Sequence, residues 1–207
     1  MERTIKTLAL GFVLAATGML LQTSTVNGGN RERHSYRIPL YTQGDGSIQA
    51  KQALVSLPSE LVVNSTPEIE SERRDLLAWH FRNAAQAAHA FAAKEKLEVH
   101  RANVPGAVEI FYDPSGVAAA TGLPRSEGGM TAVARIDLNN GIVYLGRKTP
   151  MDLYTELGKW FFYAPDYRWG QQRLEDLKML RRAERFARFC LDAKNWNEKG
   201  GSAGSLW

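Results

Sequence analysis

The sequence has little of several features that mark well-known protein classes. Its single cysteine, Cys190, excludes an intramolecular disulfide framework and a cysteine-cluster zinc site. No glycine-rich phosphate loop follows a predicted strand, and no serine nucleophile elbow is present. A metal site would need carboxylates beside the four histidines, which are His34, His80, His89 and His100.

Neither sign of charge is in large excess. The chain has 207 residues, with 26 lysines and arginines against 22 acids and a formal net charge of +4. A dedicated nucleic-acid binder shows a denser basic stripe with interleaved aromatic residues, so we expect no nucleic-acid partner. Apolar residues make up 44% and charged residues 23%, as in an ordinary globular protein of one domain.

The N-terminus is typical of an exported chain. Arg3 and Lys6 precede an apolar stretch from Leu8 to Leu21, which is the layout of a secretory signal. This stretch is short for a spanning helix, which needs about 20 apolar residues. No clear Ala-x-Ala cleavage site follows it, so two interpretations stay open: a signal peptide over residues 1–28, or an uncleaved anchor contacting the membrane through residues 5–22. We therefore expect a periplasmic, secreted or membrane-anchored protein.

Composition divides the remaining chain into three parts. Residues 29–67 are polar and broken by glycine and proline, so we expect an arm or linker there. An α+β domain is predicted over 68–198, followed by a flexible tail over 199–207. The domain opens with a long helix from about 68 to 98, because apolar residues recur at steps of three and four: Leu77, Phe81, Ala84, Ala88 and Phe91.

Three side chains with reactive chemistry have a plain structural interpretation. His80 and His89 lie nine residues apart on the predicted helix, about two and a half turns, so they cannot bind one ion together. We expect both histidines at the surface. Cys190 stands between Phe189 and Leu191, and we expect a buried, inert thiol.

The middle of the domain predicts strands. Val108–Tyr112 alternates with β-branched and aromatic residues, and Asp113–Gly116 is predicted as a turn. Met130–Asp137 and Ile142–Leu145 are two further strands. Asn139–Gly141 between them predicts a tight hairpin, because asparagine and glycine tolerate positive φ.

Two helices follow the hairpin. Thr149 and Pro150 supply an N-cap and a first-turn proline, and the helix runs to about Tyr163. A last helix is predicted over 171–195. The predicted fold is therefore α+β: a long N-terminal helix, a small antiparallel sheet with a hairpin, and two helices.

The helix after the hairpin carries a pattern of interest. Its residues 155–159 read Thr-Glu-Leu-Gly-Lys, with Glu156 in second place and Gly158 in fourth. In zincin metallopeptidases a helix in this position carries His-Glu-x-x-His, which places two imidazoles on one face and the glutamate beside the metal-bound water. On these residues, and on the order of elements over 68–195, the chain resembles a degenerate zincin-like domain.

The departures from the zincin motif decide what the resemblance implies. Thr155 and Lys159 stand where the histidine ligands would be, and an ammonium has no lone pair to offer zinc. The resemblance therefore implies no metal and no cofactor, with Glu156 a vestige of the general base. Glu184, within Ala-Glu-Arg-Phe-Ala, resembles the third ligand of the glutamate-using branch.

Glu184 also has an interpretation that does not depend on the family. Leu177, Leu180, Ala187 and Leu191 would share its helix face, so a lone carboxylate there would be costly. We expect Lys159 to form an ion pair with Glu184.

Three functions follow from these patterns. The favoured one is an exported, non-catalytic zincin-like protein that acts by binding in the cell envelope. The second is an active envelope hydrolase, with His100 or His34 brought beside Glu156 and Glu184. The third is an envelope assembly protein without peptidase ancestry, in which Thr155, Glu156 and Lys159 are surface residues. The aromatic cluster Trp160–Trp169 is either core packing or a patch for a protein partner.

Overall fold

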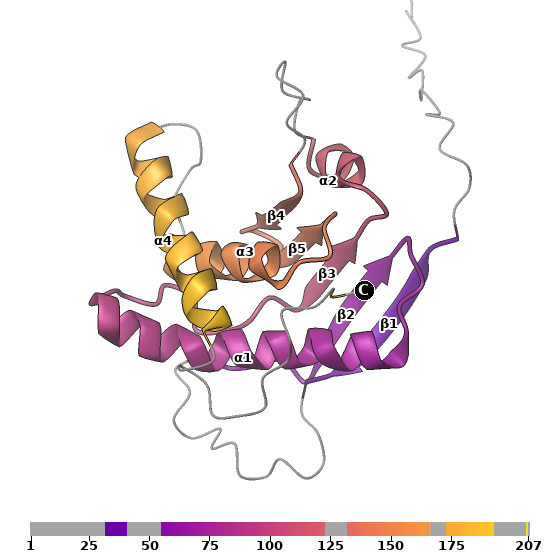
Figure 1. Ribbon diagram of the computed structural model, residues 1–207, viewed down its shortest axis with the longest axis horizontal. Helices are drawn as coiled ribbons and strands as arrows, with labels where there is room; N and C mark the ends of the chain where they lie inside the picture. Colours follow the sequence, from indigo (N-terminus) through magenta and orange to yellow (C-terminus); the bar gives the residue numbers. More distant parts are fainter. Residues whose placement is uncertain are drawn as a thin grey trace, which may run out of the picture. The chain divides into compact units, whose positions relative to one another are not determined.

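The computed structural model describes residues 32–40, 55–122, 132–164, 166, 173–192 and 206. It confirms the α+β class: a five-stranded mixed sheet and four helices lie in this part of the chain (Figure 1). The predicted N-terminal signal and residues 199–205 of the tail lie outside it. The elements in chain order are β1 (His34–Pro39), β2 (Glu60–Ser65), α1 (Ser71–Glu95), β3 (Ala107–Ile110), α2 (Pro114–Thr121), β4 (Ala134–Asp137), β5 (Ile142–Leu145), α3 (Pro150–Phe162) and α4 (Arg173–Leu191).

The sheet differs from the small antiparallel sheet that we expected. Its strand order is β1-β2-β3-β5-β4, with β2, β3 and β5 parallel and with β1 and β4 as antiparallel edges. Of the strand pairings that we expected, only the antiparallel β4–β5 hairpin is present in this sheet. Parallel pairing needs a crossover between strands, and the long helix α1 supplies it between β2 and β3.

The sheet begins before the first helix, so the predicted helix-first order is wrong. β1 and β2 both lie in residues 29–67, which we expected to be an arm or linker. β2 alternates buried and half-buried positions, but one six-residue strand holds too little apolar area to predict a core by itself. Its apolar side becomes core only when Val63 aligns with Val108, and Val108 with Val143, across three strands.

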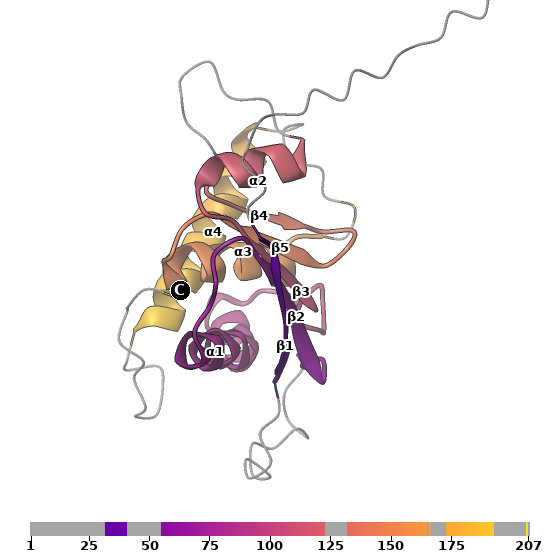
Figure 2. The same ribbon diagram turned by 90° about the vertical axis from the view of Figure 1, so that its right-hand side faces the viewer.

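Helices α1 and α3 pack on one face of the sheet, and α4 packs against these two helices (Figure 2). The core lies between them and the sheet, where the strands contribute Leu61, Val63, Val108, Ile110, Val143 and Leu145. On the opposite face one cross-strand row is polar and brings together Asn64, Glu109, Tyr144 and Arg135. None of the helices in the described ranges has the length and hydropathy that crossing a membrane requires.

A small helix replaces one predicted turn. Asp113–Gly116 is the start of α2, because the Asp113 carboxylate accepts a hydrogen bond from Ser115 N at 2.9 Å and Pro114 occupies the first helical position. Asp-Pro-Ser is a turn signal and also a helix-start signal. The apolar residues that follow, which include the buried Val117 and Ala118, decide in favour of the helix.

Helices α3 and α4 cross at a close contact between small residues. A Cβ added at Gly158 would lie 3.1 Å from the Ala183 Cα and 3.0 Å from the Phe186 ring. Phe186 in turn packs edge-on against Phe91 of α1, with ring centroids 5.4 Å apart. The three helices therefore meet around one aromatic group beside Gly158.

Candidate functional site on helix α3

The local sequence fixes where α3 begins. Thr149 is its N-cap and Pro150 its first residue, as expected. The Thr149 hydroxyl lies 3.4 Å from Asp152 N, which is a long capping contact. The preceding hairpin turns at Gly141, which has φ of +65°. The cap and the first-turn proline thus set the start of α3. One turn of this helix carries Thr155, Glu156 and Lys159.

Thr155 is turned back on its own helix. Its hydroxyl donates a hydrogen bond to Met151 O at 2.8 Å, one turn earlier, and the side chain is half-buried. Such a bond satisfies the hydroxyl within the backbone. Thr155 therefore does not present its oxygen to a ligand.

Glu156 and Lys159 form a buried ion pair. Lys159 Nζ donates to Glu156 Oε1 at 2.6 Å, and the two side chains are 18% and 4% exposed, respectively. The second carboxylate oxygen, Oε2, is buried and has no hydrogen-bond partner in the described part of the chain. A buried carboxylate oxygen without a donor is costly, so the burial of Glu156 Oε2 destabilises the fold at this point of α3.

The residues present do not fit a zinc ion. The Thr155 hydroxyl is committed to Met151 O, and the Lys159 ammonium already occupies one oxygen of Glu156. Across the described ranges no group of three histidine, cysteine, aspartate or glutamate side chains is placed to hold a metal. His34, His100, Glu156 and Glu184 are all described residues, and the fold does not assemble them into such a group.

Glu184 does not make the ion pair that we expected. Lys159 is bonded within its own helix to Glu156, and no ion pair of Glu184 occurs in the described part of the chain. Glu184 is half-buried at the flank of α4. The tie between α3 and α4 is the apolar contact at Gly158 rather than an ammonium–carboxylate pair.

The reason is the rotation of α4. The helix buries Ala183, Phe186, Ala187 and Cys190. Leu177 and Leu191, which we expected on the inner stripe, are exposed. The close approach of Gly158 requires a small residue opposite it, and Ala183 meets that need where a leucine would not. The face predicted from the leucine pattern is therefore displaced by about one residue from the face of α4 that is buried.

The sequence reasoning missed a buried polar group on the other side of α3. Tyr154 is fully buried, its hydroxyl accepts a hydrogen bond from Asn83 Nδ2 at 2.7 Å, and it lies 2.6 Å from His80 Nδ1. The hydroxyl is satisfied in both roles when it donates to Nδ1, which leaves the imidazole proton on Nε2. Burial lowers the pKa of His80 to about 4 and raises that of Tyr154.

Our expectation that His80 lies at the surface is therefore wrong. His80 is three residues after Leu77 and four before Ala84, so it falls on the apolar stripe of α1. That spacing was the available signal. His89 is half-buried.

The aromatic cluster is core where the structure describes it. Trp160, Phe161, Phe162 and Tyr163 are buried, and Trp160 Nε1 donates to Asn103 O at 2.6 Å. The other predicted members, Tyr167 and Trp169, lie outside the described residues. The described part of Trp160–Trp169 thus offers no exposed patch for a partner. Cys190 is buried, as expected, and burial raises the pKa of its thiol.

No family model matches this sequence, and no curated protein or solved structure is similar to it at a significant level. The interpretation of the site therefore depends on its own geometry.

Proposed function

We propose that this chain is an exported, non-catalytic protein of zincin-like architecture that acts by binding in the cell envelope. The observation that carries the proposal is the Lys159 ammonium held 2.6 Å from Glu156 Oε1. A metallopeptidase places a cation beside a glutamate at this point of the helix, and here the chain supplies the cation itself. The ammonium is fixed by a covalent side chain and has no open coordination position.

The same pair argues against the hydrolase. A general base must reach a water molecule with a lone pair that is accessible. One Glu156 oxygen accepts from Lys159, and the other is buried. A hydrolase with unusual ligands would also need His100 or His34 beside Glu156, and the described residues contain no such cluster.

The order of elements supports the architectural part. An antiparallel hairpin precedes α3, and α4 packs across α3 at Gly158. The hairpin before α3 is one of the features on which the resemblance was based. The sheet order, with β4 as an antiparallel edge next to β5, is compatible with them.

Two complementary measurements test whether the site on α3 binds zinc. The purified native chain should contain no stoichiometric zinc, and chelators should leave its melting temperature unchanged. The double variant Thr155→His/Lys159→His should gain about one zinc per chain, because two imidazoles four residues apart bind one ion. A further change, Glu184→Gln, should weaken that binding if Glu184 is in third-ligand position.

The matched control is Arg181→His/Arg185→His, which puts the same spacing on the exposed side of α4. It should bind zinc more weakly than the α3 double variant. One zinc per native chain would contradict the non-catalytic function. Equal zinc binding by the two double variants would contradict the zincin-like architecture.

Export is tested separately. A reporter enzyme fused after residue 31, before β1, should be active outside the cytoplasm, because Arg3 and Lys6 precede the apolar stretch Leu8–Leu21. Mass spectrometry of the mature N-terminus would then distinguish cleavage from anchoring. A cytoplasmic, full-length product would contradict this part of the proposal.

A further inference from the structure

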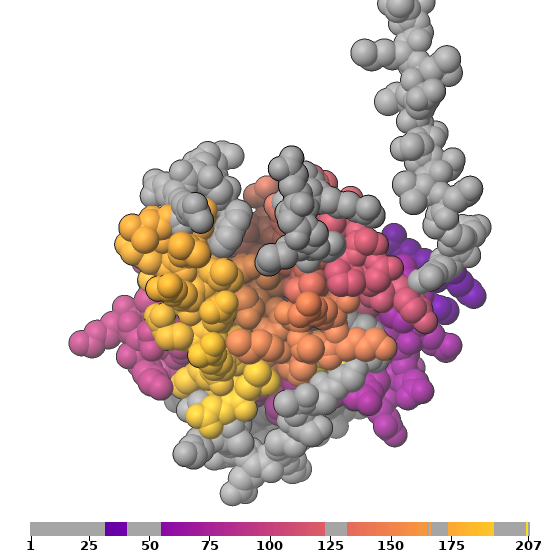
Figure 3. Space-filling model, turned by 45° about the horizontal axis from the view of Figure 1, so that its top comes forward, coloured from indigo at the N-terminus to yellow at the C-terminus, as the bar shows by residue number. Residues whose placement is uncertain are grey.

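The outward face of α4 has an unusual composition. Between residues 174 and 191 seven positions of this helix are exposed, and each holds a leucine or a basic residue. We call this set the basic stripe: the leucines 174, 177 and 191, with Lys178, Arg181, Arg185 and Arg188. Of the acids of the helix, Asp176 is buried and Glu184 is half-buried, whereas the Glu175 side chain is 44% exposed and pairs with Lys178. Side chains of α4 form part of the molecular surface in Figure 3.

The leucines of the stripe are exposed to an uncommon extent. Leu174, Leu177 and Leu191 are 66%, 44% and 37% exposed. Within the described residues only one other large apolar side chain, Tyr112, is exposed. Scattered apolar residues are normal on a surface, but three on one helix face indicate an interaction surface.

Two charges of the stripe are uncompensated. The side chains of Arg181 and Arg188 form no ion pair in the part of the chain that the structure describes. Lys178, by contrast, lies 2.7 Å from Glu175. The stripe therefore carries net positive charge beside its leucines.

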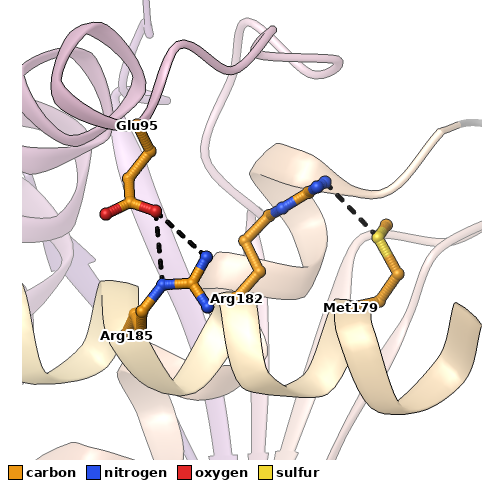
Figure 4. Close-up of polar contacts among 4 residues, drawn as sticks. All are labelled: Glu95, Met179, Arg182 and Arg185. Atoms are coloured by element: carbon orange, nitrogen blue, oxygen red, sulfur yellow. Dashed lines mark hydrogen bonds and ion pairs between the residues drawn. The ribbon is translucent and has the colours of Figure 1, made fainter.

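Two arginines of α4, Arg182 and Arg185, make contacts with other side chains of the protein (Figure 4). Arg185 donates to Glu95 Oε2 of α1 through Nε at 3.2 Å and Nη2 at 3.0 Å. Arg182 lies 3.5 Å from the Met179 sulfur. Two donors of Arg185 thus share one carboxylate oxygen of Glu95, and this contact links α4 to α1.

We propose that the basic stripe of α4 is a docking surface for an anionic lipid membrane. Exposed leucines beside uncompensated arginines combine the two attractions that hold a helix at an anionic membrane surface, which are burial of apolar area and attraction to negative headgroups. From Leu174 to Leu191 the helix extends about 26 Å at 1.5 Å per residue, with the arginines between the leucines. A continuous layer of negative headgroups matches this length better than a local acidic patch on a protein.

The inference rests on one part of the proposed function, that the chain is exported and acts by binding in the cell envelope, and does not depend on the zincin-like part. An uncleaved N-terminal segment would hold the domain near the lipid, which raises the effective concentration of headgroups at the stripe. Each basic residue near an anionic surface contributes about fivefold to binding. Two uncompensated arginines are therefore enough for a measurable effect.

A fluorescent probe at the stripe tests the proposal in the full chain. Leu177→Cys provides one exposed thiol for an environment-sensitive dye, whereas native Cys190 is buried and reacts slowly. The dye emission should shift to the blue with vesicles of two parts phosphatidylcholine and one part phosphatidylglycerol, and the shift should weaken at high salt. Vesicles of phosphatidylcholine alone should give no shift. The same dye at Tyr112→Cys, on another exposed surface, should not respond.

A variant with reversed charges on the basic stripe is the second test of the proposal. Arg181→Glu/Arg188→Glu should weaken the apparent affinity for the anionic vesicles by at least about tenfold. The matched control, Arg147→Glu/Lys148→Glu, makes the same change in net charge at exposed residues outside α4. Its loss of affinity for the anionic vesicles should be much smaller. Circular dichroism should show both variants folded.

Several results would overturn the proposal. These are an equal shift with neutral vesicles, an equal shift at position 112, and equal losses in the two charge variants. A shift with polyglutamate but not with vesicles would assign the stripe to an acidic protein instead. The zinc measurements are unaffected by any of these outcomes, so failure of the membrane surface and failure of the zincin-like architecture are distinguishable.

Discussion

Helix α3 carries two buried polar groups only two residues apart, and they differ in charge and in satisfaction. The Tyr154 hydroxyl is neutral and has two partners, His80 and Asn83 of α1. The Glu156 carboxylate bonds to Lys159 through one oxygen and leaves the other buried without a partner in the described residues. The Tyr154 hydroxyl therefore links α1 to α3, whereas the hydrogen bond of Glu156 stays within α3.

This difference bears on why each group is present. The hydrogen bonds of the Tyr154 hydroxyl join α1 to α3 and orient the two helices, while His80 Nε2 is buried without a hydrogen-bond partner in the described residues. A buried ion pair is weak evidence for stability, because the cost of desolvating two charges offsets their attraction. Glu156 therefore has no evident structural benefit from its second oxygen, which supports the proposal that this position serves binding.

The largest effect should follow from breaking the charged pair on one side. Lys159→Met leaves the Glu156 carboxylate buried without a cation, and we expect a loss of about 3–5 kcal/mol in the free energy of unfolding. Urea denaturation followed by circular dichroism measures it. The Lys159 side chain is 18% exposed, so solvent screening favours the lower end of this range.

The double variant Lys159→Met/Glu156→Leu sharpens the result. This double variant removes both charges. Its loss of unfolding free energy should be well below that of Lys159→Met, because no uncompensated charge remains. A double variant as unstable as the single one would show that the lost stability came from packing rather than from charge.

The neutral network should show itself in the pH dependence of stability. Burial lowers the pKa of His80 to about 4 in the folded state, against about 6.5 in the unfolded chain. Between these values the unfolded state binds more protons, so stability is complete above pH 6.5 and falls as the pH decreases toward 4. The loss attributable to His80 should reach about 3 kcal/mol.

Protonation would also place a proton on Nδ1, where it would face the Tyr154 hydroxyl in place of the lone pair. Unfolding free energies at pH 7, 6, 5 and 4 measure the slope. The variant His80→Leu should be less stable at pH 7 but should have a shallower slope. An unchanged slope in this variant would assign the acid sensitivity to other groups.

The two groups also differ in how far the sequence predicts them. Lys159 and Glu156 are three residues apart on one helix, so local geometry makes their pair predictable, although we expected Lys159 to pair with Glu184. Tyr154 meets His80 and Asn83 across more than 70 residues. Such a contact depends on how α1 packs against α3, which the periodicity of either helix does not determine.

The same limit explains the errors in the fold. The hairpin and α3 are encoded by turn residues, caps and proline, and the prediction was close there. The expected Lys159–Glu184 pair failed because the rotation of α4 is set by Gly158 against Ala183, a long-range fit of small residues. β1 and β2 were missed because their apolar positions become core only through pairing with distant strands.

A smaller effect is expected from removing one oxygen of the neutral network. Tyr154→Phe keeps the ring but leaves His80 Nδ1 and Asn83 Nδ2 buried without their partner. We expect a loss of about 1–3 kcal/mol, the cost of unsatisfied buried polar groups. Chemical denaturation at pH 7 gives the value. Adding Asn83→Leu should cost less than the two single changes together, since the partners act on one hydroxyl.

The smallest effect should come from the exposed counterpart of the charged pair. Lys178 and Glu175 on α4 have the same spacing of three residues and nearly the same distance, 2.7 Å, but their side chains are 58% and 44% exposed. Water solvates both charges when the pair is broken, so Lys178→Met should change the unfolding free energy by less than about 0.5 kcal/mol. The ratio of this value to that of Lys159→Met isolates burial, because charge, spacing and helical setting are matched. If the two lysine variants lost similar stability, the burial of Glu156 would have no energetic consequence, and the argument that its unpaired oxygen marks a functional position would fail.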